Sequence, residues 1–336
     1  MSARAALAVA AVWLAGCGRY ADFTLPPLAG GNPRLTFQFE ALPDPVLSPG
    51  EGWESRDVLA PAMVDGRSMF YSGFDGHTWR TGMATSEDGV FWRKHGMLLE
   101  PDARGWEGDY IAGNGTALSF TGQLWYWYVA GARELPRIGL WRLPDHGGAA
   151  VREPRPVLDS GPFESWDERG VADPYVVRIG PNFYMYYLGQ DRARRQRLGV
   201  ARSADGVRWR KLRSNPILEP GGPGAFDENG LGEPAVFESG GFYWMLYTGR
   251  DLGERRRLGV ARSTDGVHWQ KLPAVFAGQQ TWDSKVICDP SVVIENGQIR
   301  VWFGGGDVAS PDENLHGHIG LAVLKPLAML KPGAAP

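Results

Sequence analysis

Cysteine is nearly absent from this chain of 336 residues, which has two, Cys17 and Cys288. We expect Cys17 to be lipidated, as argued below, so Cys288 has no partner and no disulfide holds the fold. The formal charge is also small, −3 at pH 7, and gives no sign of nucleic-acid binding. Because 43% of the residues are apolar and there are 14 Trp, the chain is not disordered.

Segments with a helical period of apolar residues are also scarce. Glycine and proline are abundant instead, at 46 and 25 residues, and aromatic residues make up 12% of the chain. This composition favours an all-β fold. The length fits one large domain or two ordinary ones.

The N-terminus holds an apolar run, residues 5–13, that is too short to span a bilayer. It follows Arg4 and ends in Leu-Ala-Gly-Cys at residues 14–17, which resembles a bacterial lipobox. The resemblance implies a signal peptide over 1–17, lipidation of Cys17 and an exported protein anchored in the cell envelope. An ordinary secretory signal that contains a cysteine is the alternative. Residues 18–33, rich in Pro and Gly, predict a flexible tether before a single domain over 34–336.

An aromatic–acid pair recurs five times, at intervals of 53 to 60 residues. The pairs are Trp53-Glu54, Trp106-Glu107, Trp166-Asp167, Phe226-Asp227 and Trp282-Asp283. Each repeat contains several short apolar or alternating runs separated by Gly, Asp and Pro. Four short strands per repeat, arranged radially, predict a five-bladed β-propeller.

The N-terminal part of the domain predicts how the ring closes. Pro45–Gly50 matches Pro216–Gly221, which precedes the fourth repeat and reads as a fourth strand. The last repeat lacks such a strand. We therefore expect Pro45–Gly50 to complete the last blade and remove its open edge.

Ser-x-Asp-Gly-x-x-Trp segments at Ser203–Trp209 and Ser263–Trp269, with a related segment at Ser86–Trp92, have a structural interpretation. They resemble the hairpin signature of sialidases and related propellers. Asp-Gly between apolar strands is turn chemistry, and we expect the Trp to pack between blades. No catalysis is assigned to them.

Features that differ between repeats are the candidates for function, because features shared by all five are scaffold. One position, at the start of each predicted innermost strand, is occupied in turn by Ala60, Asn114, Asp173, Glu233 and Asp289. Propeller geometry predicts that these residues converge around the axis. The ends of the second strands, with Asp75, Asp191, Asp251 and Asp307, return to the same face. Clustered carboxylates separate one another's pKa values, which supplies an acid and a base.

The architecture resembles the five-bladed glycoside hydrolases, a group that includes family 43 arabinanases and xylosidases, invertases, levansucrases and mannoside phosphorylases. Ala172-Asp173-Pro174-Tyr175 resembles their Asp-Pro segment, and Glu233-Pro234 resembles the segment of their general acid. The resemblance implies that Glu233 is the general acid and that Asp173 orients it or stabilises the transition state. The family's base or nucleophile lies one blade earlier, where this chain has Asn114 with Glu107 and Asp109 upstream. The third carboxylate is instead Asp289, to which we assign that role.

Arginines gather in two loops that follow the second strands of repeats three and four. They recognise an anionic sugar or phosphate, or they form a solvated surface. The matching loop of repeat five holds His316 and His318. Some relatives bind calcium near the axis through such a histidine, so His318 is a candidate calcium ligand, with a structural role as the alternative.

These features predict an exported, inverting glycoside hydrolase that is a monomer, requires no cofactor and touches the membrane only through its anchor. Predicted substrate contacts are Asn114, Asp191, Asp251, Asp307, Arg194, Arg250 and Arg255. A phosphorylase and a non-catalytic glycan-binding propeller are the alternatives.

Overall fold

The computed structural model describes residues 18–144 and 148–328. The predicted signal peptide and the lipidation of Cys17 lie outside these residues. In the described ranges, no helix is long and apolar enough to cross a membrane.

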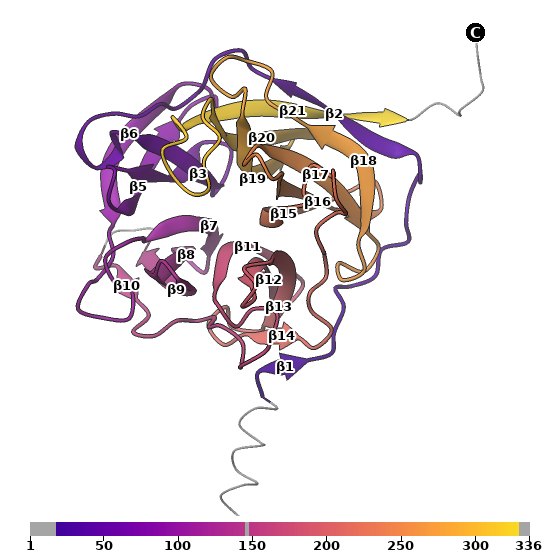
Figure 1. Ribbon diagram of the computed structural model, residues 1–336, viewed down its shortest axis with the longest axis horizontal. Helices are drawn as coiled ribbons and strands as arrows, with labels where there is room; N and C mark the ends of the chain where they lie inside the picture. Colours follow the sequence, from indigo (N-terminus) through magenta and orange to yellow (C-terminus); the bar gives the residue numbers. More distant parts are fainter. Residues whose placement is uncertain (1–17, 145–147, 329–336) are drawn as a thin grey trace, which may run out of the picture.

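The fold is all-β, as predicted, and its antiparallel strands form five blades around a central axis (Figure 1). Blade one comprises β3 (Asp57–Met63), β4 (Ser68–Phe74), β5 (Trp79–Ser86) and β6 (Trp92–Leu99), and blade two β7 (Gly113–Phe120), β8 (Gln123–Ala132), β9 (Leu135–Pro144) and β10 (Val151–Arg152). Blade three comprises β11 (Val171–Ile179), β12 (Asn182–Gln190), β13 (Gln196–Ser203) and β14 (Arg210–Leu212), and blade four β15 (Gly230–Ser239), β16 (Phe242–Arg250), β17 (Arg256–Ser263) and β18 (Gln270–Phe276). Blade five comprises β19 (Val286–Glu295), β20 (Gln298–Gly306), β21 (His318–Ala328) and β2 (Leu35–Ala41). A short 3₁₀ turn, η1 (Gly52–Glu54), precedes blade one.

The innermost strands form a closed ring, because β3, β7, β11, β15 and β19 each contact the next and β19 contacts β3. Apolar clusters fill the spaces between neighbouring blades. Each of the five blade–blade interfaces has its own cluster, and a further one lies near the axis. The molecule is therefore stabilised by repeated sheet-on-sheet packing rather than by one central core.

Ring closure by the N-terminal chain is confirmed, but the predicted segment is wrong. β2 pairs antiparallel with β21, from Leu35 opposite Ala328 to Ala41 opposite Ala322. Within the predicted segment Pro45–Gly50, Leu47 makes an isolated bridge to Ile319. The matching leucines of blades two and three, Leu158 and Leu218, make the same kind of bridge. The sequence match was therefore correct, but the matched segment marks a bridge that follows the fourth strand.

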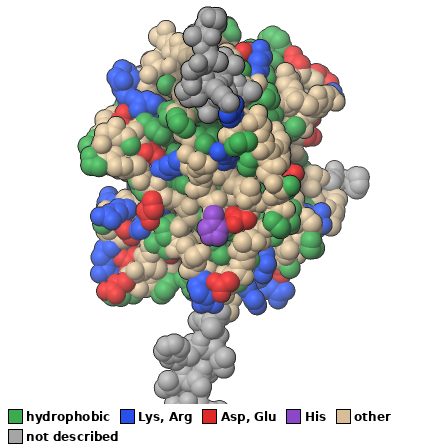
Figure 2. Space-filling view, turned by 90° about the vertical axis from the view of Figure 1, so that its right-hand side faces the viewer, with side chains coloured by type: hydrophobic (Ala, Val, Ile, Leu, Met, Phe, Trp, Pro, Cys, Tyr) green, Lys and Arg blue, Asp and Glu red, His purple; other side chains and the backbone are tan. Residues whose placement is uncertain are grey.

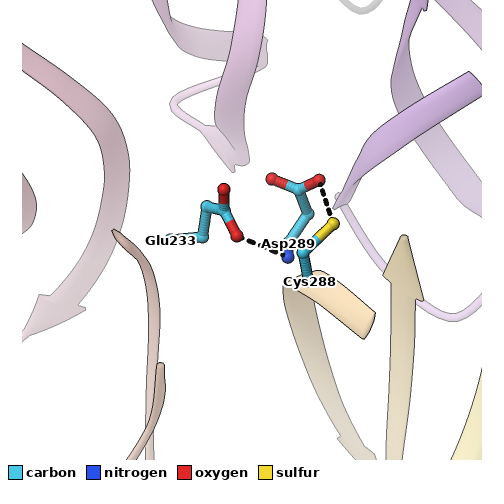
Figure 3. Close-up of side chains that lie close together, drawn as sticks. All are labelled: Glu233, Cys288 and Asp289. Carbon is cyan, nitrogen blue, oxygen red and sulfur yellow. Dashed lines mark hydrogen bonds between the residues drawn. The ribbon is translucent and has the colours of Figure 1, made fainter. Parts of the chain in front are cut away.

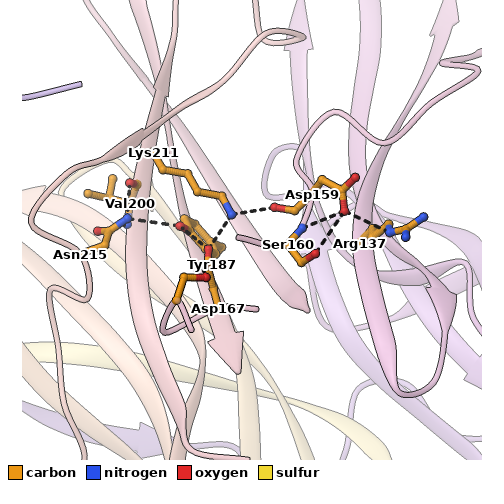
Figure 4. Close-up of polar contacts among 9 residues, drawn as sticks. Arg137, Asp159, Ser160, Asp167, Tyr187, Val200, Lys211 and Asn215 are labelled. Atoms are coloured by element: carbon orange, nitrogen blue, oxygen red, sulfur yellow. Dashed lines mark hydrogen bonds and ion pairs between the residues drawn. The ribbon is translucent and has the colours of Figure 1, made fainter. Parts of the chain in front are cut away.

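The aromatic–acid pairs are scaffold, as blade three illustrates. The Trp166 ring covers Gly189 and Gly199 so closely that a Cβ there would lie 2.3 Å and 2.6 Å from ring atoms. Asp167 beside it is fully buried and accepts hydrogen bonds from Lys211 and from Tyr187 (Figure 4). In blades one, two and four the corresponding ion pairs are Glu54–Lys94, Glu107–Arg152 and Asp227–Lys271.

The Ser-x-Asp-Gly turns join neighbouring blades, which confirms their structural interpretation. The carbonyl oxygen of Gly206 accepts a hydrogen bond from Trp209 of its own turn at 3.0 Å. It also accepts one from Trp127 of blade two at 2.9 Å. The carbonyls of Gly266 and Gly89 bridge blades four and three, and blades one and five, in the same way.

Residues 18–33 are packed against blades three and four, so the prediction of a flexible tether over this range is wrong. β1 (Tyr20–Ala21) adds a parallel strand to β14. Leu25 is 1% exposed, and its backbone N–H donates to the carbonyl of Asp265 at 2.8 Å. Apolar side chains such as Leu25 fill gaps on the rim, and this burial outweighs the flexibility that Pro and Gly suggest.

Candidate active site

Five equivalent residues, one at the bulge of each innermost strand, meet at the axis; we call them the ring positions. They are Ala60, Asn114, Asp173, Glu233 and Asp289. Each has a positive φ, with values of 49°, 47°, 49°, 51° and 49° respectively. Each also lies at a register shift in its β-ladder. The predicted convergence of these residues is confirmed, since all five line a narrow channel of about 30 Å³ at the axis.

The local sequence explains why these side chains point inward. A proline follows four of the five ring positions, at residues 61, 174, 234 and 290, and glycine follows the fifth. Proline cannot donate to a ladder and is tolerated at a bulge. The left-handed conformation costs a non-glycine residue of order 1–3 kcal/mol. It persists here because the surrounding structure of the ring holds the backbone in place. Such strain is concentrated at functional sites.

A wider cavity of about 500 Å³ opens beside the ring. Asn114, Asp173 and Glu233 line both this cavity and the narrow channel, whereas Asp289 lines the narrow channel. Trp79 and Tyr110 supply aromatic surface to the wider cavity. The volume falls within the usual range for small-molecule sites, and aromatic walls with a few polar groups are the usual lining.

Glu233 and Asp289 are joined by a hydrogen bond (Figure 3). The backbone N–H of Asp289 donates to Glu233 Oε2 at 3.1 Å, and the thiol of Cys288 donates to Asp289 Oδ2 at 3.1 Å. One ligand atom from each of these three residues lies within 4.8 Å of the others, so the group has the spacing of a metal site. Metal ligands must be deprotonated, however, and burial raises the pKa of the Cys288 thiol well above its usual range.

The electrostatics keep protons in this cluster at neutral pH. Burial raises the pKa of Asp173 well above its usual range, and the negative charges of Glu233 and Asp289 add to the shift. Burial and the charge of Glu233 raise the pKa of Asp289 to about 7. At least one carboxyl of the cluster is therefore protonated near neutral pH, which is the state a general acid requires.

Arg256 lies beside the ring, and it was not among the predicted substrate contacts. It is 8% exposed, and it lines the wider cavity with Glu233. Burial lowers its pKa, but the negative charge of Glu233, with smaller contributions, raises that pKa overall. Its guanidinium donates to the carbonyls of Ser310 and Pro311, and within the described ranges it has no carboxylate in an ion pair. Comparison of repeats could have singled it out, because the matching residue in blade three is Gln196.

Three predicted substrate contacts, Asp191, Asp251 and Asp307, belong to the scaffold and do not line the cavity. Asp191 accepts the N–H of Arg195 at 3.0 Å and pairs with Arg197. Asp251 repeats this arrangement with Arg255 and Arg257, and Asp307 contacts His316 at 2.8 Å. Asp75 and Arg80 of blade one form the same pair. The aspartate recurs in four of the five blades, and this recurrence indicates a structural role.

The arginine loops are largely neutralised by nearby acids. Arg194 lines the cavity edge but pairs with Glu134 at 3.0 Å, and Arg192 pairs with Glu168 at 2.9 Å. Arg250 lines the cavity, pairs with Glu254 at 3.3 Å and donates to Gln196. Arg255 is exposed and is absent from the cavity lining.

His318 does not fit the predicted calcium site. Its Nδ1 lies 2.9 Å from the hydroxyl oxygen of Ser48, and the ring packs edge-on near Trp282. Burial lowers the pKa of this imidazole. Neither the narrow channel nor the wider cavity is lined by His318, so its contacts support the structural alternative.

No family model matches the chain. Two uncharacterized proteins of Mycobacterium tuberculosis, MT1551 and Rv1502, are each 31% identical to it over 172 residues. The matched region covers 47% of this chain and 55% of either relative, so the match spans about half the length of these relatives.

Solved structures of glycoside hydrolases have the same fold as this chain. A family 117 glycoside hydrolase of Zobellia galactanivorans has a TM-score of 0.64 and 16% identity, over 87% of this chain and 91% of the other. A GH130 structure, described with hydrolases that target β-1,2 mannosidic linkages in Candida mannan, has a TM-score of 0.66 and 18% identity over 90% and 96%. A thermostable family 43 glycoside hydrolase has a TM-score of 0.62 and 15% identity over 85% and 100%.

The predicted resemblance is therefore confirmed at the level of structure. The chain is similar to the five-bladed propeller glycoside hydrolases of families 43, 117, 130 and 32. At these identities the likeness defines the propeller fold, and the activity must be argued from the site itself.

Proposed function

We propose that this protein cleaves glycosidic bonds by carboxylate acid–base catalysis at the ring positions. The observation that carries the proposal is a group of three carboxyls, strained into the left-handed conformation beside an aromatic-walled cavity, in which Asp173 and Asp289 have raised pKa values. An acid and a base with separated pKa values are the requirement of glycoside hydrolysis.

Asp173 and Glu233 are the best candidates for the acid–base pair, because both line the wider cavity where a sugar fits. Burial and the charges of Glu233 and Asp289 raise the pKa of Asp173, so this carboxyl keeps a proton that it can donate to the leaving oxygen. Glu233 would then be the base that activates water or the nucleophile that attacks the sugar. Asp289, which lines the narrow channel, would influence the protonation of the other two carboxyls through its charge. This reverses the acid role that the sequence assigned to Glu233.

The prediction of an inverting enzyme takes Glu233 as the acid and Asp289 as its partner. The oxygens of Glu233 and Asp289 approach within 4.8 Å, which is closer than the roughly 6.5–9.5 Å that inverting enzymes need between carboxyls. Glu233 and Asp289 are therefore poorly suited as an inverting pair with a water molecule between them.

Phosphorolysis is the second candidate, and Arg256 favours it. A buried guanidinium that forms no ion pair with a carboxylate of the described residues, beside the candidate acid, could hold phosphate in place of water. A non-catalytic glycan-binding propeller would need the cavity but not the protonated carboxyls.

A screen of chromogenic glycosides and oligosaccharides, with and without inorganic phosphate, tests the proposal. We expect Asp173→Asn and Glu233→Gln to lower turnover roughly 10²–10⁴-fold. Asp191→Asn, which changes a scaffold carboxyl outside the cavity, is the matched control and should retain most activity. Phosphate-dependent turnover would identify a phosphorylase. Glycan binding without turnover in the wild type would overturn catalysis and leave the binding function.

A further inference from the structure

A second and larger cavity, of about 780 Å³, lies on the rim between blades two and three. Its walls are the segment 155–162 that links the two blades, the strand β14 and the added strand β1. It shares no lining residue with the candidate active site. We call it the rim cavity.

The rim cavity is positively charged. Arg19, Arg137, Arg155 and Lys211 line it, and Asp159 is its one acidic residue. Asp159 is already paired with Arg137 at 3.1 Å, as Figure 4 shows, and Lys211 is held by Asp167 behind the wall.

Two of the cations, Arg19 and Arg155, remain uncompensated. Both are exposed, and neither makes an ion pair or a side-chain hydrogen bond with residues 18–144 or 148–328. Over the face shown in Figure 2, by contrast, acidic and basic side chains are interspersed. The rim cavity therefore brings together two guanidinium groups that have no ion-pair partner among the described residues.

The rim cavity lies close in the sequence to the predicted lipid anchor. Arg19 follows Cys17, the predicted lipidation site, by two residues, and the apolar run 5–13 lies just before it. β1 is fixed to the rim because Tyr20 and Ala21 pair with Lys211 and Leu212, at the lower edge of Figure 1. A membrane attachment at Cys17 would hold the rim cavity within a few residues' length of the lipid surface.

We propose that the rim cavity binds the phosphate headgroup of an anionic lipid through Arg19 and Arg155. Arginine presents a planar fork of donors that matches phosphate. Basic residues at a membrane surface gain about 1 kcal/mol each from anionic lipids, and this adds to the binding energy of an acyl anchor. The site would fix the orientation of the propeller as well as its attachment, and it rests on the predicted anchor but not on the proposed catalysis.

Vesicle flotation of the full chain tests the site. We would compare pure phosphatidylcholine vesicles with vesicles that contain phosphatidylglycerol, at constant ionic strength. The wild type should prefer the anionic vesicles, and Arg19→Ala with Arg155→Ala should reduce that preference roughly 10–30-fold. Binding to neutral vesicles, which depends on the anchor, should not change.

The matched control is Arg67→Ala with Arg93→Ala, which removes the same charge from exposed positions on blade one. An equal loss in both double variants would overturn the proposal, because it would show a general effect of net charge. Reduction of the preference by millimolar inorganic phosphate at constant ionic strength would support the proposal, because free phosphate and a phosphate headgroup would compete for the same guanidinium groups. A wild type without preference for anionic vesicles would overturn the proposal.

Discussion

At the scale of single residues, the ring positions combine strain, burial and charge at one point. Three of the five carry carboxyls in the left-handed conformation, and two of these have raised pKa values. Such an arrangement stabilises neither the fold nor the charges. It is what a site selected for chemistry, at some expense to stability, is expected to show.

Asp289→Asn should therefore stabilise the protein at pH 8. The folded chain holds the Asp289 proton up to about pH 7, whereas the unfolded chain releases it near the ordinary value of about 3.9. Stability contributed by this carboxyl is therefore lost as pH rises from about 4 to about 7, because the unfolded state binds fewer protons over that range. Thermal unfolding should show a variant with a higher midpoint than the wild type at pH 8 and a smaller difference at pH 4.

Exposed Glu87 provides the control for this measurement, because Glu87→Gln should leave the pH dependence unchanged. If the Asp289 variant is equally or less stable than the wild type at both pH values, the buried carboxyl does not carry the expected energetic cost.

The ring positions were predictable from the sequence, because five aligned repeats identify one position whatever the details of packing. Comparison of the repeats also marks Arg256 as a residue that differs between blades, but the contacts of the loop aspartates were not predictable. Asp191 and Asp251 end strands at the correct face, but their carboxylates turn back to the loop backbone. Which partner a carboxylate chooses depends on side-chain geometry that strand order does not specify.

At the scale of elements, blade five differs from the others in its buried acid. At one equivalent position in each blade, a residue of the third strand faces a residue of the fourth strand. The fourth-strand residue is basic in blades one to four (Lys94, Arg152, Lys211 and Lys271), whereas it is Ala41 in blade five. Burial raises the pKa of Asp283, whose carboxylate accepts a hydrogen bond from the backbone N–H of Gln280 at 2.7 Å. β2 therefore forms backbone pairs with β21 but supplies no positive side chain for Asp283.

Ala41→Lys should therefore stabilise the closure of the ring. Its ammonium would occupy the place that Lys211 takes beside Asp167 and would pair with Asp283. A gain of about 1 kcal/mol, seen as a rise of a few degrees in the unfolding midpoint, is the expected result. Lys211→Ala is the reciprocal experiment and should cost about 3–5 kcal/mol, because it leaves a buried carboxylate unpaired. Loss of stability in the Ala41 variant would show that blade five has adapted to a neutral acid.

Residues 18–33 give a second prediction at this scale. Leu25 fills a gap against Gly266 in the apolar cluster between blades three and four. Leu25→Ala should lower the free energy of unfolding by about 2–5 kcal/mol, the usual cost of such a truncation in a core. Leu42→Ala, at an exposed position, should have little effect. Equal stability of the Leu25 variant and the wild type would restore the interpretation of this segment as a tether.

At the scale of the whole molecule, the ring is held closed by one pair of strands, β2 and β21. The Trp302 bond to the Gly89 carbonyl and the cluster between blades five and one support the same junction. The other four junctions join strands that are close in the sequence. The β2–β21 pair is the exception, because it joins a strand that precedes blade one to the last strand of the described chain.

Deletion of residues 18–41 should consequently open the ring. It exposes the edge of β21, and an unpaired edge invites association with other chains. We expect broad unfolding transitions and oligomers in size-exclusion chromatography. Deletion of residues 18–33 leaves β2 in place and should give a less stable but monomeric protein. A monomer with a sharp transition after the longer deletion would show that the other blade contacts suffice.

Closure by β2 also sets an order in time. β2 is synthesised first among the strands of the blades, and β21 is synthesised last. β2 therefore stays unpaired until the whole domain has left the ribosome. If the chain is exported through a translocase in the same direction, the wait is repeated on the far side of the membrane. A prematurely terminated chain that lacks β21 therefore cannot close the ring. Its unpaired strand edge would be recognised by the chaperones and proteases of the compartment that it reaches.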